Sequence, residues 1–270
     1  MTLAEVVAAA LAEDLGPLGD ITAALLPSKA TAEALLVPRT AGVLAGCPAA
    51  REAFLQVDRG LDVAWSAWDG DTVTPGSAVA RVTGRLASVL TAERTALNFL
   101  CHLSGIATVT RRYVDAVAGR ALILDTRKTT PGLRALEKAA VRAGGGVNHR
   151  GSLSDGILVK DNHLTGTSIA EVVVAARRMW PGRSVEIECD TVDQVHEAIA
   201  AGANGVLLDN MSPQEAAACV QLVAKRLLVE VSGGVTLENV WDYAAADPDV
   251  ISIGALTHSA PILDIGLDLA

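Results

Sequence analysis

The stretch VEIECDTVDQVHEAIAAGANGVLLD, residues 185–209, decides the fold that the sequence predicts. Its apolar ends, VEIEC and GVLLD, have the length of short buried strands, and the segment between them has apolar residues at helical spacing. From Val185 onward the strand starts recur roughly every twenty residues, through LLVEVS and VISIG. This rhythm is typical of βα units, and it predicts an α/β fold with a parallel barrel or a doubly wound sheet.

Each predicted strand in the second half of the chain has a polar residue or a glycine at or near its end. In βα barrels the carboxyl ends of the strands carry the chemistry. A single strand can end in a polar residue simply because it reaches the surface, and for one strand that is the better interpretation. Six such ends together favour a shared site. The six residues are Asp125, Lys160, Glu188, Asp209, Ser232 and Gly254.

The chain as a whole is acidic, but one segment of it is basic. Lys and Arg number 22 and Asp and Glu 31, so the net charge is −9, which argues against nucleic acid or an anionic membrane as the main partner. Residues 124–163 reverse this balance, with seven basic residues against four acids, a local charge of 7 − 4 = +3. This local reversal of sign predicts a site for an anionic ligand.

The sequence also gives expectations about location. No apolar run reaches the length of a membrane span, and the N-terminal MTLAEVVAAALAEDLG lacks the basic region of a signal peptide. The four cysteines have no metal-site spacing and are interpreted as small buried residues in a reducing compartment. We therefore expect a cytoplasmic protein.

Two short motifs supply three of the seven basic residues in 124–163 and a histidine. TRK, residues 126–128, follows the apolar run that ends in Asp125, and NHR, residues 148–150, follows three glycines that let the backbone approach a ligand. Taken alone, the first motif could be a solvated basic turn and the second could contain a structural histidine. Their positions beside predicted strand ends favour binding. The residues with this predicted role are Thr126, Arg127, Lys128, His149 and Arg150, together with Lys160 at the end of GILVK.

Acidic residues are expected in the same place. Alternation puts Glu186 and Glu188 on one face of their strand. If that face lines a barrel, both carboxylates enter an apolar interior and need partners, for which Lys128 and Lys160 are the candidates. Asp209 also ends a buried run. Glu188 and Asp209 could hold Mg²⁺, directly or through water, or hydrogen-bond sugar hydroxyls.

Small residues follow the last two predicted strands. Ser232 and Gly233 lie in VSGGV, and Gly254 lies in SIGALTHS. Backbone N–H groups exposed before a helix bind anions, and barrels often bind phosphate in these two loops, although ordinary helix capping is an alternative. The residues alone therefore describe a pocket for a phosphate-bearing polyanion and Mg²⁺.

Several stretches between about residue 13 and the C-terminus, including the TRK and NHR motifs, resemble the quinolinate phosphoribosyltransferase family and occur in the order that the family has. One departure follows His149-Arg150, where the family usually has a large apolar residue and then glycine, but this chain has Gly151 and Ser152. We expect a local change of the loop that leaves His149 and Arg150 in place. The matching stretches are EDLGPLGDIT, GVLAG, TAERTALNFLCHLSGIAT, DTRKTTPGLRALEKAAVRAGGGVNHR, ILVKDNH, GVLLDNM, VSGGV and ISIGALTHSAP.

The resemblance implies a two-domain α/β fold. Residues 1–103 would form an N-terminal open-faced α/β sandwich, which residues 262–270 would rejoin, and residues 104–261 would form an atypical seven-stranded βα barrel. Independently of the resemblance, the residue pattern predicts a helical stretch over 88–117 with a break near Ser104-Gly105. The enzyme would be a homodimer or a dimer-based hexamer with shared active sites.

The resemblance also implies an activity. The enzyme would join quinolinate to 5-phosphoribosyl-1-pyrophosphate with Mg²⁺, giving nicotinate mononucleotide, pyrophosphate and CO₂ for NAD biosynthesis. The catalytic residues would be Lys128, Glu188 and Asp209, the last two also as direct or water-mediated magnesium ligands. Arg94, supplied across the dimer interface, would bind the diacid with Arg127, His149, Arg150 and Lys160. Thr126 would bind substrate, and Ser232, Gly233 and Gly254 would lie beside the 5′-phosphate.

Other functions fit parts of this pattern. A relative associated with molybdenum, or a phosphoribosyltransferase for another pyridine acid, would share most of the motifs. A phosphate-binding barrel could instead act as a lyase or aldolase through a Schiff base on Lys160. A non-catalytic binding protein is disfavoured by the full set of charged strand ends.

Overall fold

The computed structural model describes all of residues 1–270 and divides into two compact units. The first contains Met1–Arg111, Thr129–Gly145 and Leu256–Ala270, and the second contains Arg112–Lys128 and Gly146–Ala255. The boundary predicted between residues 103 and 104 falls inside α3 (Leu86–Val117), where the backbone is continuous helix. No helix combines the length and the apolar character that crossing a bilayer requires.

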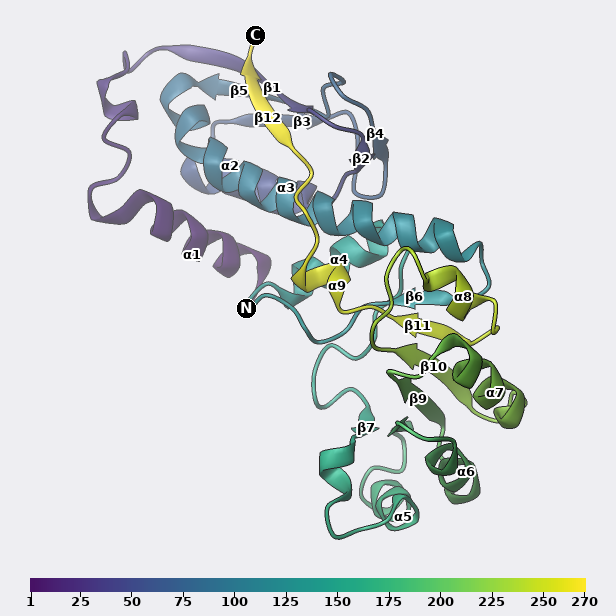
Figure 1. The fold of residues 1–270 in the computed structure, drawn as a ribbon. Coiled ribbons are helices and arrows are strands. Elements are labelled where there is room, and N and C mark those ends of the chain that lie inside the picture. Colours follow the sequence, from purple (N-terminus) through teal and green to yellow (C-terminus); the bar gives the residue numbers. More distant parts are fainter. The chain divides into compact units, whose positions relative to one another are not determined.

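The first unit is built on an antiparallel four-stranded sheet in the order β12-β1-β5-β3. The C-terminal strand pairs along β1, with Ala34 opposite Leu269. Figure 1 shows α2 and the first half of α3 lying over this sheet. The sheet strands are β1 (Thr31–Pro38), β3 (Asp62–Trp65), β5 (Ala80–Arg85) and β12 (Ile265–Leu269), and β2 (Gly42–Val43) pairs separately with β4 (Thr72–Val73). The other helices are α1 (Leu3–Leu15), α2 (Cys47–Val57), α4 (Arg134–Ala143) and α9 (Ala255–His258), with 3₁₀ turns at Gly16–Leu18 and Ala23–Leu25.

The predicted break in the long helix near Ser104-Gly105 is wrong, because α3 continues through both residues. Gly105 serves a close approach of two chain segments. A Cβ atom at this position would lie 2.1 Å from the carbonyl oxygen of Pro261, so only glycine lets the C-terminal segment pass here. The neighbouring Ser104 binds another chain segment: its hydroxyl accepts from the backbone N–H of Ala45 at 2.9 Å and donates to the carbonyl of Ala45 at 3.0 Å.

The second unit contains a parallel six-stranded sheet in the order β6-β11-β10-β9-β8-β7. All six strands predicted from the apolar runs are present. Of the seven strands implied by the resemblance, the remaining one is reduced to a single parallel bridge between Val147 and Leu124. The strands are β6 (Leu122–Leu124), β7 (Ile157–Val159), β8 (Val185–Cys189), β9 (Gly205–Asp209), β10 (Leu228–Ser232) and β11 (Val250–Ser252).

Helices cover one side of this sheet, where Figure 1 shows α5, α6 and α7 in succession. Each begins at a Ser or Thr N-cap within a capping box, which satisfies backbone N–H groups of its first turn. The N-caps are Ser168, Thr191 and Ser212. The helices are α5 (Ile169–Met179), α6 (Val192–Ala201), α7 (Pro213–Val223) and α8 (Val240–Ala244), and Asp161–Leu164 forms a 3₁₀ turn.

Strand alternation separates the core from the site. In β8 the side chains of Val185, Ile187 and Cys189 are fully buried, whereas Glu186 and Glu188 face the other way and are partly accessible. One set of alternate residues therefore packs in the aliphatic core, and the other set brings charges together on a single face.

Candidate active site

A cavity of ≈ 380 Å³ lies at the carboxyl ends of the parallel strands. Alternate residues of β9 and β10 reach it as pairs, because Asp209 lies directly opposite Ser232 in the register. The lining brings together nine of the twelve site residues predicted from the sequence. These are Thr126, Arg127, Lys128, His149, Arg150, Lys160, Glu188, Asp209 and Ser232.

Three predicted site residues do not line this cavity. Arg94 is an exposed residue of α3 in the first compact unit. Gly254 lies two residues beyond the end of β11 at Ser252. Gly233 has a φ of +87°, and a Cβ atom there would meet the side-chain oxygen of Asn210 at 2.2 Å, so both backbone conformation and space require glycine.

One of the two predicted glutamate–lysine pairs is present. Lys160 at the end of β7 forms an ion pair with Glu188 on β8, whose side chain is only 10% exposed. Two adjacent parallel strands thus each contribute one charge to the cavity. The largely covered carboxylate of Glu188 therefore has the cationic partner that its low exposure requires.

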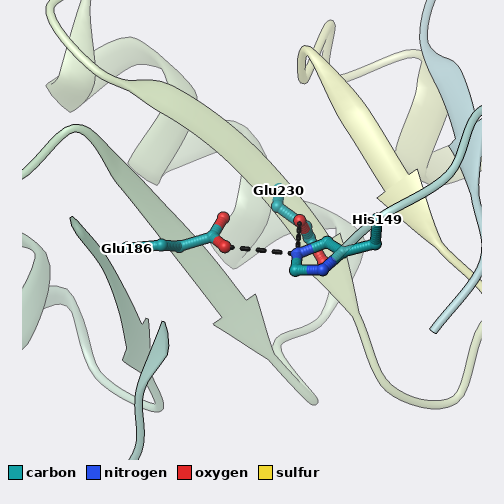
Figure 2. Close-up of side chains that lie close together, drawn as sticks. All are labelled: His149, Glu186 and Glu230. Atoms are coloured by element: carbon teal, nitrogen blue, oxygen red, sulfur yellow. Dashed lines mark hydrogen bonds and ion pairs between the residues drawn. The ribbon is translucent and has the colours of Figure 1, made fainter. Parts of the chain in front are cut away.

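Glu186 has a different partner from the one predicted. Its carboxylate lies 3.3 Å from Nε2 of His149, and neither Lys128 nor Lys160 pairs with it. The same nitrogen lies 3.2 Å from a carboxylate oxygen of Glu230 on β10, whose side chain is 2% exposed. Figure 2 shows the imidazole of His149 reaching both carboxylates.

The surroundings of His149 favour its protonated form. The hydrogen bonds to Glu186 and then to Glu230 raise the pKa of His149 to about 9, against the opposing effect of burial. Burial also raises the pKa of Glu186. In the neutral ring Nδ1 accepts from the backbone N–H of Arg150 at 2.8 Å, so the single proton lies on Nε2, toward the two carboxylates; the fully protonated ring would lose this bond.

His149, Glu186 and Glu230 have ligand atoms within 4.8 Å of one another, a spacing that also suits a metal ion. A proton shared between the imidazole and the carboxylates already explains why the three groups lie so close. We therefore interpret the group as an ion-paired histidine in the wall of the cavity.

An NMR titration of the imidazole resonances is expected to show His149 titrating at about pH 9. The folded-state pKa of about 9 lies above the value of about 6.5 for a histidine in an unfolded chain. The stability that His149 contributes is therefore fully present below about pH 6.5. It is lost as the pH rises through about 9. Replacing Glu186 by Gln removes the larger cause and should lower the pKa of His149.

The control for this titration is Glu197→Gln, a substitution on the exposed surface of α6 that should leave the pKa of His149 unchanged. An unchanged His149 pKa in Glu186→Gln would show that the carboxylate does not hold the proton.

The two arginines of the cavity make it attractive to an anion. Burial and then the nearby Arg127 lower the pKa of Arg150, which reflects a guanidinium held near a like charge. One Nη of Arg150 donates to the carbonyl of Gly156 at 3.1 Å, which fixes its position. An anionic ligand with two acceptor groups would relieve the repulsion between these guanidinium groups.

Sequence profiles of known families match both halves of the chain. Residues 20–104 match the N-terminal domain of quinolinate phosphoribosyl transferase, and residues 106–268 match its C-terminal domain. The chain belongs to the quinolinate phosphoribosyl transferase family.

Relatives within this family are similar over nearly the full length. The chain is 45% identical over 269 residues to the carboxylating nicotinate-nucleotide pyrophosphorylase of Mycobacterium leprae, covering 96% of this chain and 94% of that protein. It is 41% identical to the probable enzyme of that name from Bacillus subtilis, covering 95% and 90%. The crystal structure of nicotinate-nucleotide pyrophosphorylase from Ehrlichia chaffeensis superimposes with a TM-score of 0.96 at 38% identity, covering 100% of this chain and 99% of that one.

The departure from the family pattern after Arg150 is a local turn. The carboxylate of Asp155 accepts from the backbone N–H of Gly151 at 2.8 Å and of Ser152 at 3.0 Å, and from the Ser152 hydroxyl at 2.7 Å. His149 and Arg150 still line the cavity, as expected.

Sequence analysis missed Glu230, which belongs to this site by its contact with His149. A signal was present, because alternation in LLVEVS places Glu230 on the same face as Ser232. It named Asp125 only as one of six strand ends that favour a shared site and gave it no binding or catalytic role, although its side chain is fully buried directly after β6.

Proposed function

We propose that this member of the quinolinate phosphoribosyl transferase family transfers the phosphoribosyl group of 5-phosphoribosyl-1-pyrophosphate to quinolinate. The products are nicotinate mononucleotide, pyrophosphate and CO₂, in the synthesis of NAD. The observation that carries this proposal is the collection of cations with two flanking acids in one cavity at the strand ends. The cations are Arg127, Lys128, His149, Arg150 and Lys160.

The diacid fits the guanidinium side of the cavity. Quinolinate has two adjacent carboxylates beside its ring nitrogen, and arginine forks bind carboxylates through two parallel hydrogen bonds. Arg127 and Arg150 would bind these groups, and the positive charge of His149 beside them would favour the diacid. Lys160, between this side and Glu188, would complete the contacts.

The acid side of the cavity fits the phosphoribosyl group. When pyrophosphate departs, positive charge develops on the ribose, and the carboxylates of Glu188 and Asp209 would stabilise it. Lys128 would bind the departing phosphates. Ser232, Gly233 and Gly254 would present hydroxyl and backbone N–H groups to the 5′-phosphate.

Magnesium suits the donor set on this side. Glu188 and Asp209 offer hard carboxylate oxygens in the same cavity, and Mg²⁺ is usually held by one or two carboxylates, waters and substrate phosphates. The ion would neutralise charge on the leaving pyrophosphate.

Loss of CO₂ needs no covalent intermediate on the protein. Once the ring nitrogen is ribosylated, the pyridinium accepts the electrons released by the neighbouring carboxylate. The alternative of a Schiff base on Lys160 is disfavoured, because that chemistry requires a neutral amine and Lys160 forms an ion pair with Glu188.

Assembly and location extend the proposal. A homodimer, or a hexamer built from dimers, would let the exposed Arg94 of one subunit complete the site of its partner. A cytoplasmic location is supported by the four cysteines, all of which are free.

Carboxyl-labelled quinolinate should release CO₂ only when phosphoribosyl pyrophosphate and Mg²⁺ are present, measured as trapped label. Nicotinate, which lacks the second carboxylate, should be turned over at least about a hundredfold less efficiently, because it leaves cations of the cavity without their carboxylate partner. No release from quinolinate would contradict the proposed reaction, and comparable use of nicotinate would contradict the role given to the cations.

A further inference from the structure

Asp125 lies at the junction of the two loops that supply the cations. It directly follows β6 and precedes Thr126, and its side chain is completely buried. One carboxylate oxygen accepts from the backbone N–H of His149 at 2.9 Å, and the other accepts from the side-chain amide of Asn148 at 2.5 Å. Both bonds therefore run to the loop that carries His149 and Arg150.

The two loops differ in what else holds them to the sheet. The Asp125 side is anchored by β6, which pairs with β11 along Leu122–Leu124. The other side joins the backbone ladder of the sheet through the single bridge between Val147 and Leu124, with backbone hydrogen bonds of 2.8 and 3.3 Å. The Asp125 carboxylate adds two hydrogen bonds where the backbone ladder is one bridge long, so its loss is expected to displace residues 148–150 more than residues 126–128.

We propose that Asp125 is a positioning residue that holds His149 and Arg150 at the place where they bind the substrate diacid. This inference rests on the proposed function. A carboxylate that accepts two hydrogen bonds in a buried place is a strong and directional clamp. The clamp acts on one substrate, because residues 148–150 contribute only to the diacid side of the cavity, whereas Lys128, Glu188 and Asp209 lie on the phosphoribosyl side.

The test compares the full-length wild-type enzyme with three variants in the CO₂-release assay, varying each substrate in turn. Asp125→Ala should raise KM for quinolinate at least about tenfold and KM for phosphoribosyl pyrophosphate less than about threefold, since a displacement near 1 Å can cost about a hundredfold. The exchange of Asp125→Asn with Asn148→Asp keeps one acid and one amide in contact. It should restore KM for quinolinate to within about threefold of wild type.

Asp249→Ala is the matched control. Asp249 also uses its carboxylate to accept a backbone N–H, that of Val229 at 2.8 Å, but it precedes β11 at the opposite end of the sheet. This variant should lose stability without a change in either KM. Equal effects of Asp125→Ala on both substrates, or no effect on quinolinate beyond that of Asp249→Ala, would overturn the positioning role.

Amide hydrogen exchange of His149 tests the positioning role of Asp125 without measuring enzyme activity. Asp125→Ala should exchange the amide of His149 at least about tenfold faster than wild type, corresponding to the loss of one bond of about 1.4 kcal/mol. If wild-type protein releases no CO₂ from quinolinate with phosphoribosyl pyrophosphate, the proposed function is wrong. If the His149 amide exchanges in Asp125→Ala at the wild-type rate, the positioning role of Asp125 is wrong. If Asp125→Ala does not fold, Asn148→Ala removes the amide bond to Asp125, keeps the bond from the His149 N–H, and should raise KM for quinolinate about threefold. An unchanged KM in Asn148→Ala would then overturn the proposal.

Discussion

Asp209→Asn is expected to lower the turnover number by about 10²- to 10³-fold while changing the affinity for quinolinate by less than about twofold. The substitution keeps the size and hydrogen-bonding shape of the side chain and removes its charge. Asp209 ends β9 within the cavity, beside the proposed place of the ribose. A charge that matters mainly as positive charge develops on the sugar affects the transition state more than the bound substrates.

The thermal stability of Asp209→Asn shows whether a loss of turnover is due to unfolding. Burial raises the pKa of Asp209, against the opposing effects of Lys160 and Lys128. Above that pKa the ionised carboxylate costs the folded state some stability, and Asn removes the cost. The thermal midpoint of Asp209→Asn should therefore equal or exceed that of wild type, so that lost turnover cannot be ascribed to unfolding.

Stopped single turnovers and isothermal titration with quinolinate separate the two effects. Asp193→Asn, in the exposed first turn of α6, provides a control with the same chemical change outside the cavity. Normal turnover combined with weak quinolinate binding in Asp209→Asn would show that this carboxylate belongs to the diacid side of the site.

Arg94→Ala and Lys128→Ala are each expected to be nearly inactive as homodimers, and a mixture of the two is expected to regain activity. Arg94 is exposed on α3 and does not line the cavity that contains Lys128. If Arg94 acts across a two-fold interface, a mixed dimer has one doubly damaged site and one intact site. Random pairing makes about half of the dimers mixed, so about a quarter of wild-type activity should return.

The mixture is prepared by co-expression with two different affinity tags, and the heterodimer is isolated by sequential purification. The purified heterodimer should have about half of wild-type activity, because one of its two sites is intact. Arg94→Lys mixed with Lys128→Ala tests whether the guanidinium fork, and not only its charge, is needed. Verified heterodimers that remain inactive would show that Arg94 serves its own subunit or has no role in the site.

The sequence alone determined where the second unit has strands and which of their residues meet. The runs from β6 to β11 are recognisable because a parallel sheet covered by helices requires short, continuous apolar segments. Parallel strands end at one edge, so Lys160, Glu188, Asp209 and Ser232 were expected to share a site, and they line one cavity. Period-two alternation also put Glu186 on the face of Glu188, since that pattern depends only on local backbone geometry.

Only the tertiary structure decided which charges pair. Glu186 lies near His149 because the loop that follows Val147 brings the imidazole to β8 and β10, and no local pattern specifies where such a loop leads. Glu230 and Asp125 gained their contacts in the same way, from segments distant in sequence. The continuity of α3 through Gly105 had a similar cause. The local sequence around a glycine predicts a possible helix break. In α3, however, Gly105 makes room for the backbone of Pro261. Pro261 lies 156 residues further along the chain (261 − 105), so only folding brings the two residues into contact.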